Sequence, residues 1–216
     1  MLKDRVDIEE CTLTEKITSA ILSGLGAAGG VTIIVLCIIN SSLRENIFSV
    51  VTGSIFGAGV FLFSIMSTMY HSLTAESAKR VFLILSNCML HLVVLGIDCI
   101  YFLAGIGGAI GWTMFGVSCA IALVPIVFSG INLNKFKFIS YMFAIVNLWV
   151  SILLFHQLIA KIGIEGFISY IVAQMLCTFA SLFYILGKKF DNMHIIFHVF
   201  SLLGIAIHFL TIYYYM

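Results

Sequence analysis

The 216 residues carry a formal net charge of +1, and 62% of them are hydrophobic while only 10% are charged. A soluble domain averages about 45–50% apolar and about 25% charged residues, so a soluble fold of this length could not bury this much apolar surface. Mean hydropathy is +1.16. These values predict a multi-pass protein of the cell membrane, and the near-neutral charge argues against a nucleic-acid partner.

Apolar runs long enough to cross a bilayer recur along the whole chain. A spanning helix needs about 20 predominantly apolar residues. Seven such segments are predicted, near Ile17–Ile39, Ile47–Tyr70, Val81–Ala104, Ile110–Phe128, Phe136–Phe155, Ile164–Leu186 and Met193–Tyr215. The expected fold class is therefore all-α, a polytopic bundle of seven transmembrane helices.

The distribution of Lys and Arg predicts the orientation of the bundle, because cytoplasmic loops carry an excess of these residues. Residues 1–16 are expected to form a cytoplasmic N-terminal segment, followed by one transmembrane domain over residues 17–216. This topology places only Arg44 and Lys161 outside, and nine basic residues inside: Lys3, Arg5, Lys16, Lys79, Arg80, Lys135, Lys137, Lys188 and Lys189. The C-terminus is then expected outside.

Three histidines interrupt the last apolar segment. At 100° per residue, His198 lies about 40° from His194 around the helix axis, and His208 lies about 40° from His194 on the other side. The three histidines therefore share one helix face. On the predicted topology His194 and His198 lie near the cytoplasmic face. His71 ends the second segment at the same level, and Ser67 precedes it by one turn.

An i, i+4 histidine pair with a third histidine from another helix is a good zinc-binding arrangement. Three neutral imidazoles suit Zn²⁺ and leave a fourth position for water. The spacing therefore predicts a metal site at His71, His194 and His198. The alternative is that these side chains form hydrogen bonds between helices, as polar groups in membranes commonly do.

The third segment carries a second polar stripe. Asn87, His91 and Asp98 are separated by four and seven residues and share one helix face. Asp98 is expected at about the depth of His208, and a hydrogen bond or ion pair between these two side chains is predicted. A carboxylate within a membrane is a functional candidate by default, and both a structural tie and a transport role are consistent with this pattern.

Two motifs make the chain resemble the hemolysin III family. STMYHS at Ser67–Ser72 is similar to the Ser-x-x-x-His signature that ends the second helix of that family. HIIFHVFSLLGIAIHF at His194–Phe209 is similar to its last-helix pattern, His-x-x-x-His followed ten residues later by His-Phe. SGLGA, KRVFLIL and LFYILGKK fit as further landmarks, and the resemblance covers essentially the whole chain.

The resemblance implies a seven-helix membrane protein related to progestin and adipoQ receptors and, more distantly, to alkaline ceramidases. Carried over residue by residue, it implies a zinc ion near the cytoplasmic face with His71, His194 and His198 as ligands. Ser67 matches the serine one turn before the first ligand. His208 matches a trailing histidine that is not a ligand.

The chain departs from the family pattern early in the third helix. The family usually has an Asp-His pair there, and the Asp helps to hold a zinc-bound water. Ser86 and Asn87 occupy the corresponding positions. Asp98 lies about 18 Å further along the helix, too far to replace that Asp. This substitution weakens the expectation of a hydrolase.

Three functional classes follow from the sequence. The favoured one is a zinc-containing membrane protein that binds a lipid or fatty-acid ligand or maintains the state of the membrane. The second is a zinc-dependent hydrolase of lipid amides, although no catalytic residue can be assigned. The third is a channel or cytolytic pore, with the polar candidates along its path: Asn87, His91, Asp98 and His208.

Overall fold

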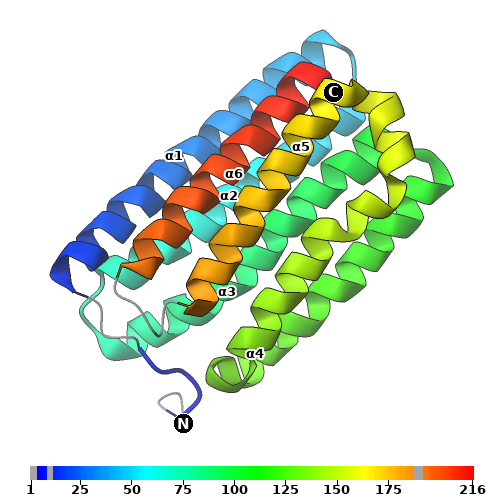
Figure 1. The fold of residues 1–216 in the computed structure, drawn as a ribbon. Coiled ribbons are helices and arrows are strands. Elements are labelled where there is room, and N and C mark those ends of the chain that lie inside the picture. The colour runs from blue at the N-terminus through cyan, green and yellow to red at the C-terminus, as the bar shows by residue number, and fades with distance from the viewer. Residues whose placement is uncertain (1–3, 9–11, 187–191) are drawn as a thin grey trace.

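The computed structural model describes residues 4–8, 12–186 and 192–216, and every regular element in those ranges is helical (Figure 1). The elements in chain order are α1 Leu13–Leu43, α2 Ile47–Ser72, α3 Glu76–Cys99, a π-helical turn Ile100–Ile106, α4 Gly108–Val150, a 3₁₀ turn Ser151–Leu154, α5 Phe155–Leu186 and α6 Met193–Tyr215. The predicted all-α fold class is confirmed.

Local capping explains where the first two helices begin. The Thr12 side chain accepts a hydrogen bond from the backbone N–H of Glu15 at 3.2 Å, and Asn46 caps α2 in the same way through Ser49. Such caps satisfy N–H groups that have no partner within the helix. The helix α1 consequently begins at Leu13, inside the segment 1–16 that was predicted to precede it.

The number of candidate spans differs from the prediction. Within the described residues, five helical stretches are long and apolar enough to cross a membrane, and not seven. The difference lies in one stretch, Gly108–Leu186, which has 79 residues and contains three of the predicted segments. The sequence located the apolar runs, but it did not show that these three follow one another without a separating loop.

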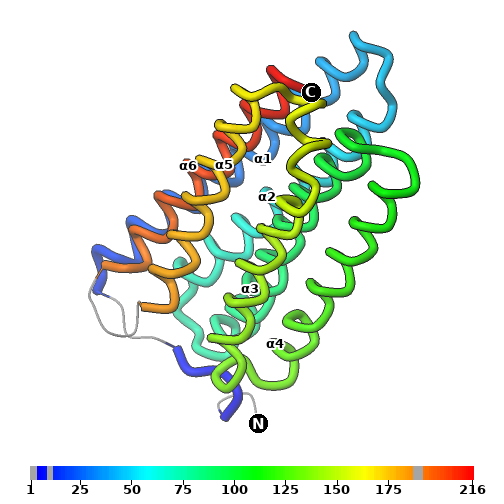
Figure 2. Tube along the Cα trace, turned by 45° about the vertical axis from the view of Figure 1, so that its right-hand side comes forward, coloured from blue at the N-terminus to red at the C-terminus, as the bar shows by residue number. Residues whose placement is uncertain are grey.

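Two backbone breaks divide this long stretch into three limbs, 108–131, 133–162 and 164–186. Asn132 has extended dihedrals (φ −160°, ψ 99°), and its side chain accepts a hydrogen bond from the N–H of Lys135 at 3.0 Å. Gly163 has φ 71°, a left-handed conformation that glycine adopts without strain. The backbone reverses direction at both breaks, as Figures 1 and 2 show.

The helices pack around one main apolar core. The helix α1 lies against α2 and α6, α3 lies against α2 and α4, and α5 lies against α6. Close approach of α1 and α2 depends on Gly30, where an added Cβ would stand 2.6 Å from the backbone nitrogen of Phe61. The neighbouring Gly29 faces open space.

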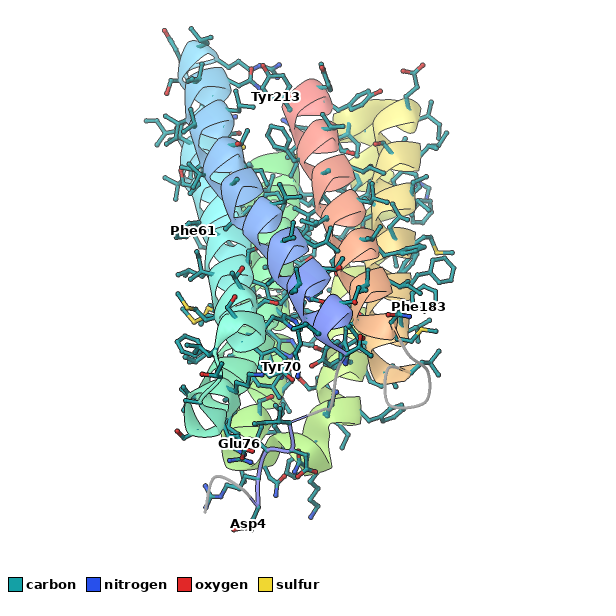
Figure 3. All side chains as sticks on the ribbon, turned by 90° about the vertical axis from the view of Figure 1, so that its left-hand side faces the viewer. Asp4, Phe61, Tyr70, Glu76, Phe183 and Tyr213 are labelled. Carbon is teal, nitrogen blue, oxygen red and sulfur yellow. The ribbon has the colours of Figure 1, made fainter. Side chains whose placement is uncertain are left out.

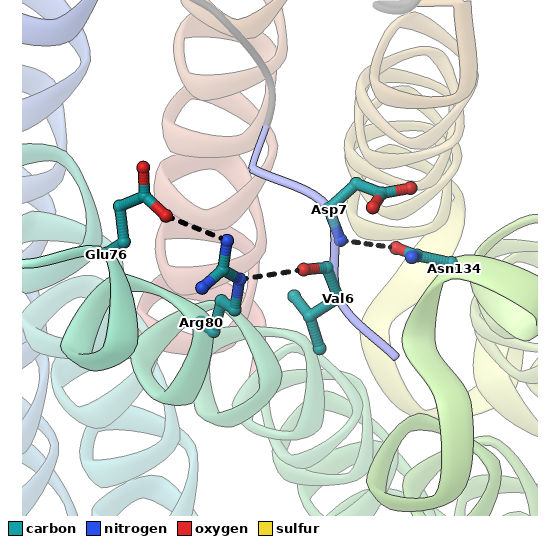
Figure 4. Close-up of polar contacts among 5 residues, drawn as sticks. All are labelled: Val6, Asp7, Glu76, Arg80 and Asn134. Atoms are coloured by element: carbon teal, nitrogen blue, oxygen red, sulfur yellow. Dashed lines mark hydrogen bonds and ion pairs between the residues drawn. The ribbon is translucent and has the colours of Figure 1, made fainter. Parts of the chain in front are cut away.

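The described N-terminal residues 4–8, here called the N-terminal strap, dock across one end of the bundle (Figure 4). The Asp7 N–H donates to Asn134 Oδ1 at 2.7 Å, and the Asn134 N–H donates to the Arg5 carbonyl at 3.1 Å. Arg80 donates from Nε to the Val6 carbonyl at 3.1 Å, and its guanidinium also pairs with Glu76 at 3.0 Å. The strap thus joins the start of α3 to the second limb of α4.

The Val6 side chain anchors the strap. It is fully buried in a small cluster with Tyr70, Leu83 and Leu133. Tyr70 lies at the end of α2, and its ring centroid is 4.8 Å from that of His71. Figure 3 shows Asp4, Tyr70 and Glu76 toward one end of the bundle and Tyr213 at the other. The strap therefore covers the end of the bundle that carries His71.

Candidate metal centre between α2 and α6

The structure brings His71 and His198 together from positions 127 residues apart. Their Nε2 atoms are 3.3 Å apart, and their ring centroids are 5.4 Å apart. Both side chains are buried. The helices α2 and α6 thus position two imidazole nitrogens that point at each other inside the bundle, as the histidine spacing predicted.

Two serines, Ser67 and Ser23, form a chain of contacts that ends at the His198 ring. Ser23 Oγ lies 3.4 Å from His198 Nδ1 and 2.9 Å from Ser67 Oγ. A partner on Nδ1 orients the ring and leaves Nε2 to face His71. Ser67, the serine one turn before the first predicted ligand, is therefore linked to His198 through the Ser23 hydroxyl.

Ser23 is a site residue that the sequence reasoning did not single out. It lies on α1, in the SGLGA stretch that served only as a landmark of the resemblance. Ser19, Ser23, Gly26 and Gly30 are all buried on this helix. Spacings of three and four residues place small and hydroxyl side chains on one face, and this pattern is the signal that could have identified it.

His194 is the third predicted ligand and lies one turn before His198. It is buried and close enough to both His71 and His198 to interact electrostatically with each. Its ring also packs edge-on against Tyr184, with the centroids 5.2 Å apart. The three predicted histidines therefore lie in one neighbourhood.

The geometry of the pair can be compared with the needs of a zinc ion. Two nitrogens at about 2.0–2.1 Å from zinc and at a tetrahedral angle are about 3.3–3.4 Å apart. The 3.3 Å between the Nε2 atoms of His71 and His198 matches this value. A third ligand is not in position, since the described residues contain no group of three or more His, Cys, Asp or Glu side chains arranged to hold a metal ion.

Asn87, which stands at the position of the His in the family's Asp-His pair, turns away from the His71–His198 pair. Its amide nitrogen donates to Ser129 Oγ at 2.6 Å and to Ser140 Oγ at 2.9 Å, and His91 Nε2 lies 2.8 Å from Ser140 Oγ. These contacts tie α3 to the first two limbs of the 108–186 stretch. Ser86, beside Asn87, is half-buried. Asn87 and His91 thus form a separate cluster with hydroxyl partners.

The predicted bond between Asp98 and His208 is not formed. Asp98 Oδ2 accepts from Ser118 Oγ at 2.8 Å, and His208 Nδ1 lies 3.3 Å from Tyr101 Oη. Within the described residues, Asp98 Oδ1 and His208 Nε2 have no hydrogen-bond partner. Both side chains are buried, but the position of a residue along its helix does not determine which neighbour it faces.

Within the described residues, no carboxylate contacts the His71–His198 pair in place of the Asp that the family usually has. Glu76, five residues after His71, has a side chain that is 71% exposed and pairs with Arg80. The departure from the family pattern at Ser86 and Asn87 therefore has no local compensation in the part of the chain that the structure describes.

Comparison with known proteins gives one family and two curated relatives. The model of the family described as haemolysin-III related matches residues 15–209. A Bacillus cereus protein named hemolysin-3 is 26% identical over 201 residues, which cover 93% of this chain and 91% of that protein. A hemolysin-3 homolog of Bacillus subtilis (strain 168) is 28% identical over 204 residues, or 94% and 95% of the two chains.

No solved structure matches the chain. The family match extends from the first turns of α1 to the last turns of α6 and includes both histidine motifs. The chain belongs to the haemolysin-III-related family of membrane proteins.

Proposed function

We propose that this chain is a multi-pass protein of the cell membrane in which zinc, held by His71, His194 and His198, ties α2 to α6, and that it binds membrane lipid. The observation that carries the proposal is the 3.3 Å distance between the Nε2 atoms of His71 and His198. Two neutral imidazoles that face each other in a bundle are suited to a shared divalent cation. His194, one turn away on the same face of α6, is the proposed third ligand, and its ring would have to turn toward the pair when the ion binds.

The residues of this centre have different roles in binding the ion. His71 and His198 would bind the ion through Nε2, and Ser23 holds the His198 ring through Nδ1. Ser67 positions the Ser23 hydroxyl. A bound zinc ion supplies a cross-link between helices and a Lewis acid. With Asn87 committed to Ser129 and Ser140, the structural role has more support than hydrolysis of a lipid amide.

The proposed topology has seven crossings, with the N-terminus inside, the segment 1–16 cytoplasmic and residues 17–216 as one transmembrane domain. The breaks at Asn132 and Gly163 support separate crossings by the limbs 108–131, 133–162 and 164–186. A helix of 30 residues is about 45 Å long, enough for one crossing. The excess of Lys and Arg at the end with the N-terminal strap supports its cytoplasmic location, although Lys3, Lys188 and Lys189 lie outside the described residues.

Metal analysis of the purified full-length protein tests the proposal. We expect about one zinc per chain in the wild type, with most of it lost in His71→Ala and in His194→Ala. His156→Ala is the matched control, because His156 is an exposed histidine, and its zinc content should equal that of the wild type. Wild-type protein that folds in zinc-containing medium and carries no zinc would overturn the proposal.

A further inference from the structure

A groove lies at the end of the bundle that carries His71. Its volume is about 540 Å³, within the range of about 300–1,000 Å³ found for ligand sites. One wall is the start of α1, and the other is the end of α2 with the connection to α3, including His71, Ser72 and Thr74. His198 and the residues of the N-terminal strap do not line this groove, so it is a separate feature of the structure.

The α1 wall is an apolar stripe open to the surroundings. Leu13, Ile17 and Ile21 follow one another at intervals of four residues, which places them on one helix face. Their side chains are 74%, 51% and 59% exposed. In a membrane-spanning helix such a stripe faces lipid, so an acyl chain of the bilayer can enter the groove from the side.

The groove also carries positive charge. Lys16 and Lys79 both line the groove, from α1 and α3 respectively. Neither forms an ion pair with another residue in the ranges that the structure describes. Ser72 and Thr74 on the second wall add two hydroxyl groups as further donors. Two ammonium groups and two hydroxyls beside an apolar stripe match the chemistry of a phosphate group attached to an acyl chain.

We infer that this groove binds one anionic phospholipid of the adjoining leaflet. The phosphate lies between Lys16 and Lys79, and one acyl chain lies along Leu13, Ile17 and Ile21. The second acyl chain stays in the bilayer, since the groove is open on the membrane side. Because Lys79 is also close enough to His71 to interact with it electrostatically, the lipid head group would lie beside the histidine pair.

Photo-crosslinking in vesicles tests this site. The full-length protein is reconstituted in phosphatidylcholine containing a small fraction of phosphatidylglycerol with a photoactivatable acyl chain. We expect cross-links to concentrate on residues 13–21 and to be weaker with the matching phosphatidylcholine probe. In Lys16→Gln/Lys79→Gln the phosphatidylglycerol yield should fall about tenfold.

The matched control is Arg5→Gln/Lys135→Gln, which removes two exposed charges from the same end of the bundle but outside the groove. Its cross-linking should match that of the wild type. An equal fall in both double variants, or no fall in either, would overturn the inference. In wild-type protein, added salt should also lower the phosphatidylglycerol yield and leave the phosphatidylcholine yield unchanged.

Different measurements test the proposed lipid site and the proposed zinc site. The groove lysines are not metal ligands, so Lys16→Gln/Lys79→Gln should keep its zinc content. His71→Ala should lose zinc, whereas both groove lysines and the apolar stripe remain in place. Loss of lipid labelling without loss of zinc supports the groove, and wild-type labelling that avoids residues 13–21 contradicts it.

Discussion

On α2 and α6 the ring nitrogens of His71 and His198 face each other, whereas on α3 the side chains of Asn87 and His91 turn to serine hydroxyls. Both regions are buried polar stripes, and in the sequence they look alike. In the second, the Asn87 amide nitrogen and the His91 ring have serine hydroxyls as partners, whereas Asn87 Oδ1 has none within the described residues. The first brings together two groups of the same kind, and a shared cation would serve both.

The largest expected effect comes from metal removal. Zinc at a thousandfold excess over its dissociation constant would stabilise the folded protein by about 4 kcal/mol. A chelator should therefore lower the thermal midpoint of the wild type clearly and leave that of His198→Ala unchanged. His91→Ala serves as the comparison, because a chelator should still destabilise it. Equal chelator effects on the wild type and His198→Ala would contradict the metal centre.

The next effect tests the support behind the pair. Ser23→Ala removes the hydroxyl at His198 Nδ1, and we expect zinc affinity to fall about 10–100-fold. Ser19→Ala is a matched control one turn earlier on α1, because the buried Ser19 hydroxyl has no hydrogen-bond partner within the described residues. Competition with a zinc-binding dye measures both variants. Equal affinities in the two would show that Ser23 does not position the ring.

The cluster on α3 should behave as a structural tie. His91→Ala, Ser140→Ala and the double variant form a cycle, and we expect a coupling free energy of about 1 kcal/mol from the 2.8 Å contact between the two side chains. Reversible unfolding in mixed detergent micelles measures it. Zinc content should stay at the wild-type level in all three. A loss of zinc in His91→Ala would remove the distinction between the two regions.

The smallest effect concerns the N-terminal strap, whose Val6 packs on Tyr70 beside His71. Arg80→Gln removes the guanidinium that donates to the Val6 carbonyl. We expect a loss of about 0.5–1.5 kcal/mol in strap docking, measured as faster proteolysis within residues 4–8. Zinc content should not change. Lys135→Gln, a nearby loss of one positive charge, should leave the proteolysis rate as it is.

Much of the fold could be predicted from composition and periodicity. Apolar runs located α1, α2, α3 and α6, and the gap between the predicted segments Val81–Ala104 and Ile110–Phe128 contains Gly107 and Gly108, which both have positive φ values. The five candidate spans were not predicted. The limbs on either side of Asn132 and of Gly163 follow one another without a separating loop, and no residue pattern indicates this.

The candidate site was predicted in part. The predicted topology placed His71 and His198 toward the same end of the bundle. Both were expected in its interior, because lipid cannot satisfy an imidazole. The partners of each side chain could not be predicted in the same way. Asp98 bonds to Ser118 and His208 to Tyr101 because rotation of each helix about its axis decides the contact. Periodicity gives only the relative angle of residues on one helix.

The ligand environment of bound zinc tests the central claim most directly. X-ray absorption at the zinc edge of the purified wild-type protein reports the type, number and distance of the ligand atoms. The account predicts three imidazole nitrogens at about 2.0–2.1 Å in the wild type. Fully folded protein with no bound zinc, or zinc bound without imidazole, would show that His71 and His198 are joined only by a hydrogen bond.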